Sequence, residues 1–65
     1  MDEMEIIRRV GELRQEHRDL DSAIDALAFA RPSDQLQIAR LKKRKLRLRD
    51  EITALEDQLI PDIIA

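Results

Sequence analysis

The stretch LKKRKLRLRDEI, residues 41–52, decides the fold of this 65-residue chain. Together with the preceding arginine it places seven basic residues among positions 40–49. Leu41, Leu48 and Ile52 nevertheless recur at intervals that bring them onto one face of an α-helix. Lys45 lies on that same face, at a step where the pattern expects an apolar residue. The stretch therefore predicts an amphipathic helix whose apolar face contains one lysine.

On both sides of this stretch, apolar residues continue at alternating steps of three and four, which is the heptad repeat of a coiled coil. The first series is Ile6, Val10, Leu13, His17, Leu20, Ile24 and Leu27, and the second is Ile38, Leu41, Lys45, Leu48, Ile52, Leu55 and Leu59. We call these fourteen positions the seam. His17 and Lys45 are its polar members.

A proline between the two series marks the boundary between two helices. Pro32 disfavours the helical conformation in the residue before it, so the first helix should end near this point. Asp34, followed three residues later by Gln37, resembles a capping box for the second helix, and Ser33 is an alternative N-cap. Because the connection is short, we expect the two helices to be antiparallel neighbours.

The predicted fold is therefore all-α, an antiparallel two-helix hairpin of coiled-coil type in a single domain spanning residues 1–65. The expected elements are a helix at about 3–30, a turn at about 31–33, a helix at about 34–60 and a short tail at 61–65. Folding the chain back at the turn pairs seam residues whose numbers sum to 65, without interruption. In this register His17 and Lys45 lie in adjacent central layers.

Composition excludes several classes of protein. Charged residues are 40% of the chain and aromatic residues 2%, which is typical of long helices, and the regular apolar spacing argues against disorder. The chain has no cysteine, which excludes disulfides and thiolate chemistry. Its longest largely apolar run, residues 26–30, is too short to span a membrane, and we do not expect the acidic N-terminus to act as a secretion signal. We expect a cytoplasmic protein.

The polar residues of the seam are the first candidate site. Asp21 follows His17 by one helical turn, and Lys45 should lie nearby on the other helix. We interpret His17, Asp21 and Lys45 as a polar layer that fixes helix register and association state at some cost in stability. A metal site is the alternative, but one histidine and one carboxylate are too few ligands for zinc without a symmetry mate.

Catalysis has little support in the sequence. Ser22, Ser33 and Thr53 are the only hydroxyl side chains, and none has a histidine at a recognisable activating spacing. Gly11 is the only glycine, so the chain has no glycine-rich phosphate loop, although an exposed glycine and a close helix contact both remain open there. We expect no enzymatic activity, no cofactor and no resident metal.

The basic residues of the second helix form the second candidate site. Arg40, Lys43, Arg44 and Arg47 share one outward stripe, which could follow the phosphates of a nucleic acid. Against this, Glu51 lies four residues after Arg47 and can pair with it, and no aromatic side chain is available in this stretch for base stacking. The first thirty residues carry eight acids and four bases, and the remainder six acids and eight bases. This asymmetry favours a solvated stripe or charge complementarity within or between hairpins.

Apolar residues outside the seam indicate a further interface. A hairpin buries only one side of each helix, so it seldom stands alone. The candidate contacts are Leu36, Leu46, Ile60, Ile63 and Ile64. We expect a homo-oligomer, most simply a dimer that forms a four-helix bundle, and the main alternative is a monomeric hairpin that docks on another protein.

Two motifs carry a resemblance to a known family. Residues 17–24, HRDLDSAI, resemble the His-x-x-Leu-Asp-x-x-Ile element of the YdcH-like family of small bacterial proteins, and residues 41–52 resemble its Leu-Lys-Lys-x-Lys-Leu-x-Leu-Lys-Asp-Glu-Ile signature. The match spans roughly residues 13–56, and Arg49 stands where lysine is common. The resemblance implies a short cytoplasmic helical hairpin from a bacterium, in a family grouped as uncharacterised. It brings no catalytic or ligand-binding residues with it.

Overall fold

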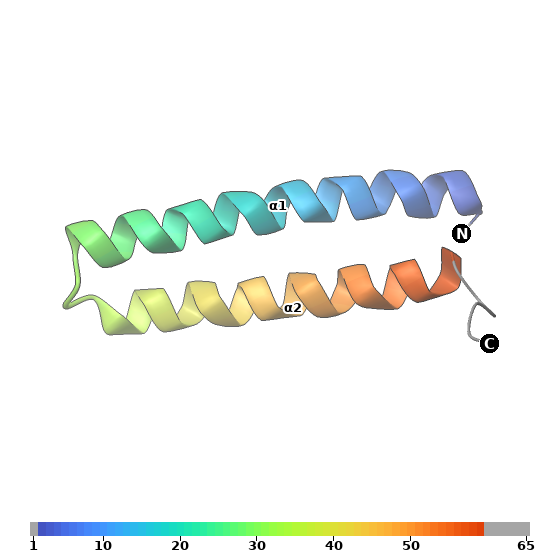
Figure 1. Cartoon of the computed structure of the whole chain (residues 1–65). Coiled ribbons are helices and arrows are strands. Elements are labelled where there is room, and N and C mark those ends of the chain that lie inside the picture. Colours follow the sequence, from blue (N-terminus) through green and yellow to red (C-terminus); the bar gives the residue numbers. More distant parts are fainter. Residues whose placement is uncertain (1, 60–65) are drawn as a thin grey trace.

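The chain folds into two long antiparallel helices joined by a tight turn (Figure 1), as the sequence predicts. The computed structural model describes residues 2–59, in which α1 is Glu3–Ala30 and α2 is Gln35–Leu59. The start of α1 and the end of α2 lie at one end of the hairpin, which we call the open end. Within the described residues, neither helix offers a stretch long and apolar enough to cross a lipid bilayer.

The start of α1 is fixed by an N-cap that the sequence analysis did not identify. The side chain of Asp2 accepts a hydrogen bond of 2.8 Å from the backbone N–H of Glu5. This bond satisfies one of the amide groups that the first helical turn leaves without a partner. Glu3 and Glu5 add negative charge to the first turn, where it interacts favourably with the helix dipole.

The hydrogen bonds of the turn come mainly from backbone groups and not from the predicted side-chain cap. The N–H of Arg31 donates to the carbonyl of Leu27 at 2.7 Å and ends α1 immediately before Pro32. Asp34 precedes α2, and its carbonyl accepts from the N–H of Ile38 at 3.2 Å. Gln35 donates its side-chain amide to the carbonyl of Pro32 at 2.5 Å.

The predicted capping box of Asp34 and Gln37 therefore differs from what the structure shows. Neither of these side chains makes a hydrogen bond within residues 2–59, and the same holds for the alternative cap, Ser33. Helix α2 begins at Gln35, directly after Asp34. The backbone hydrogen bonds of the turn form without these side chains, although Asp34 is half-buried.

The seam forms the apolar core between the two helices. Its buried members are Ile6, Val10, Leu13, Ile24, Ile38 and Leu48. The other eight seam residues, including His17 and Lys45, are half-buried. Leu13 is the most enclosed side chain, with 1% of its surface exposed. This core is one side chain thick, so each helix packs one face inward and keeps the opposite face in water.

Candidate functional site

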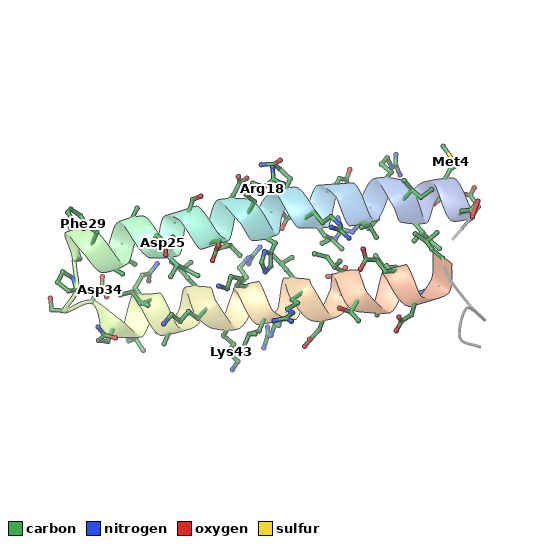
Figure 2. The ribbon with its side chains drawn as sticks, in the orientation of Figure 1. Met4, Arg18, Asp25, Phe29, Asp34 and Lys43 are labelled. Carbon is green, nitrogen blue, oxygen red and sulfur yellow. The ribbon has the colours of Figure 1, made fainter. Side chains whose placement is uncertain are left out.

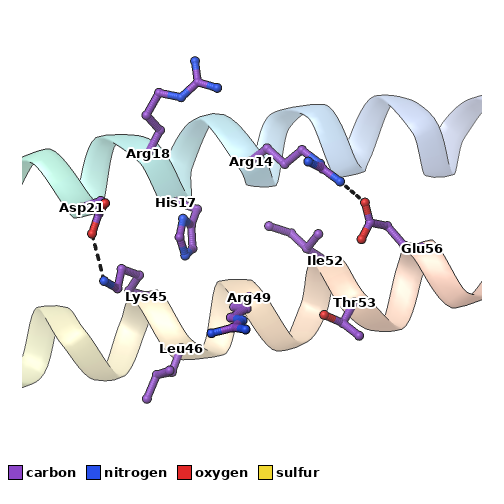
Figure 3. Close-up of a pocket in the computed structure, with 10 residues that line it drawn as sticks. All are labelled: Arg14, His17, Arg18, Asp21, Lys45, Leu46, Arg49, Ile52, Thr53 and Glu56. Atoms are coloured by element: carbon purple, nitrogen blue, oxygen red, sulfur yellow. Dashed lines mark hydrogen bonds and ion pairs between the residues drawn. The ribbon is translucent and has the colours of Figure 1, made fainter.

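Lys45 reaches out of the seam to the edge of the hairpin, where it pairs with Asp21. Its Nζ lies 2.9 Å from Oδ1 of Asp21 and donates a hydrogen bond to it (Figure 3). The lysine side chain is 29% exposed and the aspartate side chain 54%. The aliphatic part of Lys45 thus packs in the core while its charge lies at the water boundary, which is the usual behaviour of a lysine at an apolar surface.

This pairing lowers the pKa of Asp21 below its ordinary value of 3.8. The largest cause is the hydrogen bond from Lys45, followed by the charge of that lysine. His17 adds a smaller effect in the same direction, and partial desolvation opposes it. Asp21 is therefore held in its charged form by the two polar residues of the seam.

His17 lies in the gap between the helices, next to this ion pair (Figure 3). The side chain is half-buried, and within the described residues it makes no hydrogen bond. The structure thus brings the three residues of the predicted polar layer together. The direct contact in that layer is between Asp21 and Lys45.

A shallow groove of about 610 Å³ runs along this edge of the hairpin. Its lining residues are Arg14, His17, Arg18, Asp21, Lys45, Leu46, Arg49, Ile52, Thr53 and Glu56. An ion pair between Arg14 and Glu56 bounds it toward the open end, and the Asp21–Lys45 pair bounds it toward the turn (Figure 3). Both carboxylates of the groove are engaged in these pairs.

The groove contains one hydroxyl group, one imidazole and two carboxylates. Thr53 supplies its one hydroxyl group, which makes no hydrogen bond to His17 in the described part of the chain. The lowered pKa of Asp21 keeps its carboxylate charged, which does not suit it to act as a general acid near neutral pH. His17 and Asp21 provide two potential metal ligands, and among residues 2–59 no third histidine or acidic side chain joins them to form a site.

Two further ion pairs join the helices and were not predicted. Nη2 of Arg9 lies 3.6 Å from Oε2 of Glu51, and neither of these residues lines the groove. Arg14 pairs with Glu56, and both of these residues line the groove. These residues are direct neighbours of seam positions, where the side chains of coiled coils form interhelical salt bridges. The heptad repeat was the signal that could have identified them. Glu51 was instead expected to pair with Arg47, and the structure pairs it with Arg9.

The predicted basic stripe lies on the outer surface of α2. Arg40, Lys43, Arg44 and Arg47 are all exposed. None of them forms an ion pair within the described part of the chain. Lys43 projects from α2 on the side away from α1 (Figure 2). The stripe and the groove occupy different faces, since none of the four residues lines the groove.

Among the described residues, five large apolar side chains lie exposed. Leu36 and Leu46, both predicted as interface residues, are 66% and 56% exposed. Met4, Ile7 and Phe29 are also exposed, and Met4 and Phe29 mark the two ends of α1 in Figure 2. Phe29 is the only aromatic residue of the chain, and the sequence analysis did not select it. The predicted contacts Ile60, Ile63 and Ile64 lie outside the described residues.

Residues 11–56 match the family described as "Protein of unknown function (DUF465)". The YdcH-like proteins belong to this family, so the resemblance found in the two motifs is confirmed. No match was found among curated proteins or among solved structures.

Proposed function

We propose that this chain, which belongs to the DUF465 family, is a self-associating interaction module without enzymatic activity. The proposed assembly is a homodimer in which two hairpins form a four-helix bundle. The family carries no assigned activity, so the support comes from the surface of the hairpin itself.

The observation that supports self-association is the balance of buried and exposed apolar side chains. Within residues 2–59 the core has six buried apolar residues, and five other large apolar side chains are exposed. A chain of about this size rarely gains enough from a single thin core to be stable alone, and association is a common remedy. In a four-helix bundle each helix contacts two neighbours, which would bury a second face of α1 and α2.

The polar layer of the seam supports the same proposal. Apolar residues at all fourteen seam positions would favour several registers and association states almost equally. One polar residue at such a position selects among them at a cost in stability. We propose this role for Lys45, with Asp21 as its partner at the water boundary and His17 as its neighbour in the seam.

Sedimentation equilibrium at increasing protein concentration tests the proposal. We expect the apparent mass to rise from that of one chain to that of at least two chains within the micromolar range. A protein that stays monomeric at high micromolar concentration would refute self-association. In that case we expect the exposed apolar residues to contact another protein. Capture of that protein from a bacterial lysate, compared between the wild type and Leu46→Glu, tests this alternative.

Binding of nucleic acid through the basic stripe is the second candidate function. The observation in its favour is that Arg40, Lys43, Arg44 and Arg47 are exposed and unpaired within residues 2–59. If all four contacted phosphates, the logarithm of the affinity would fall with the logarithm of salt concentration with a slope of about −3.6. Titration of labelled DNA and RNA at several salt concentrations measures this slope. Absence of micromolar binding at low salt would eliminate this candidate.

We also propose a cytoplasmic location in a bacterial cell. The support is the resemblance to the YdcH-like family. Fractionation of the native cells, with detection of the untagged protein, tests this location.

A further inference from the structure

The residues that directly follow the seam positions of α1 form a second stripe along the groove side of the hairpin. These residues are Ile7, Gly11, Arg14, Arg18, Asp21, Asp25 and Ala28, and all of them are exposed. Three of them, Arg14, Arg18 and Asp21, line the groove. We call this set the α1 stripe. Its order along the helix is apolar, small, two cations, two anions and small.

This order is complementary to itself when read in the opposite direction. If two α1 helices pack antiparallel so that paired residue numbers sum to 39, Arg14 lies opposite Asp25 and Arg18 lies opposite Asp21. In the same register Gly11 lies opposite Ala28, and Ile7 lies at the level of Pro32. Each cation meets an anion, and each glycine meets an alanine. Because the pairing is symmetric, every contact occurs twice.

Within the described residues, two charges of this stripe already have a partner, since Arg14 pairs with Glu56 and Asp21 with Lys45, and the other two have none. Arg18 and Asp25 form no ion pair within the described residues. Arg18 points away from α2 in Figure 3. Asp21 binds Lys45 through Oδ1, and its side chain is 54% exposed, so its second oxygen can accept from a guanidinium. Nothing lies within 4 Å of the position that a Cβ would take at Gly11, which leaves open space for a neighbouring helix.

The exposed leucine of α2 lies at the centre of the same arrangement. The two-fold axis of the α1 pairing falls between residues 19 and 20, and residues 19 and 46 share one level of the hairpin because their numbers sum to 65. Leu46 lines the groove, so it lies on the face that the second copy would cover. We therefore propose that two hairpins pack groove to groove in opposite directions, with the two Leu46 side chains in contact at the axis.

The arrangement also has a defined weak point. Lys42 and Arg49 flank Leu46 on α2, and the same two-fold axis brings Lys42 of one copy to the level of Arg49 of the other. Like charges across an interface oppose association. The pairing therefore predicts that Arg18→Glu weakens the dimer, because it places a like charge opposite Asp21. It also predicts that Lys42→Glu strengthens the dimer, because it replaces the repulsion between Lys42 and Arg49 by an attraction. If Lys42 instead faced Asp25 of the second copy, as in a dimer with both open ends together, its reversal would weaken association.

This inference rests on the proposed self-association, and the test separates the two. The dissociation constant of the dimer is measured by sedimentation for the wild type, Arg18→Glu, Arg47→Glu and Lys42→Glu. We expect Arg18→Glu to weaken the dimer at least about tenfold and Lys42→Glu to strengthen it severalfold. Arg47→Glu is the matched control, because it makes the same charge change at an exposed arginine outside the groove, and it should have less than about a twofold effect. Circular dichroism verifies that each variant keeps its helices.

The direction of packing is measured with a spin label on Glu3→Cys, which is a unique thiol because the chain has no other cysteine. In the antiparallel arrangement the two labels are about 50 Å apart along the bundle, from a rise of 1.5 Å per residue. If both open ends lay together, the two labels would be separated only across the bundle, by about two helix diameters or about 20 Å. A dimer with equal effects of Arg18→Glu and Arg47→Glu, or with the short distance, would overturn this inference and leave self-association intact. A monomeric wild type would refute the proposed function, and this inference with it.

Discussion

Replacement of Lys45 by leucine tests whether the polar layer sacrifices stability for specificity. Full burial of a leucine side chain contributes about 1.5–3 kcal/mol relative to an exposed one. The Lys45 side chain is 29% exposed, and its aliphatic part already contributes some of this burial. The ion pair that is lost lies at the surface, with the Asp21 side chain 54% exposed, so it offsets only part of the gain. We expect Lys45→Leu to raise the free energy of unfolding by about 1 kcal/mol and the melting temperature by about 4–8 °C.

The dependence of this effect on pH has a definite sign. The pKa of Asp21 is lowered in the folded protein, so its pairing with Lys45 stabilises the fold above the ordinary value of 3.8. This contribution is lost as the pH falls through the lowered pKa of the folded state. Lys45→Leu has no such pair to lose. Its advantage over the wild type should therefore increase when the pH falls from neutrality to below 3.8.

The assay is urea unfolding followed by circular dichroism at neutral and acidic pH, with Lys43→Leu as the control. Lys43 lies outside the seam and is exposed, so the same substitution there should change the stability by less than about 0.5 kcal/mol. Sedimentation of Lys45→Leu shows whether its association state changes. A variant with lower stability than the wild type and an unchanged association state would refute the specificity role. A stability difference that does not depend on pH would refute the role of the Asp21 pair.

Three other substitutions test the fold, each by urea unfolding at low protein concentration. Leu13→Ala should cost about 2–5 kcal/mol, because Leu13 is 1% exposed, and retention of a wild-type transition would show that the core lies elsewhere. Asp2→Ala should cost about 1 kcal/mol by removing the acceptor for the Glu5 N–H, and Asp2→Ser should restore most of the loss. Gly11→Ala should stabilise the hairpin by up to about 1 kcal/mol, because it improves helix propensity in open space, and a loss of stability would contradict the exposed position.

The helical hairpin was predictable because its signal is repeated along the whole chain. Each seam residue is only one member of a regular series, so the face that packs inward does not depend on any single position. Pro32 then supplies the interruption that the regular spacing alone cannot locate. The local details at the helix ends were less predictable. Asp2 and Asp34 both precede a helix and are of a residue type that commonly caps helices, but only Asp2 does so with its side chain. Which one does so depends on the backbone geometry of a few residues.

The candidate site was predictable only in part. The register places Asp21 near Lys45, but it also allows several partners for each flexible charged side chain. Glu51 illustrates this, since Arg47 lies one turn away on its own helix and Arg9 lies across the seam, and the structure selects Arg9. The exposure of Phe29 and Leu46 follows from their positions off the seam. Which molecule covers such residues is a property of the partner as well as of this chain.

The register of the seam also governs the order in which this chain should fold. Leu27 and Ile38, next to the turn, are eleven residues apart, whereas Ile6 and Leu59 at the open end are fifty-three residues apart. Closing the shorter loop costs less entropy, so the helices should zip together from the turn outward. The last contacts to form are then the first to open. Amide hydrogens near Ile6 should therefore exchange with solvent faster than those near Ile24, and the Arg9–Glu51 and Arg14–Glu56 pairs lie where they can slow this fraying.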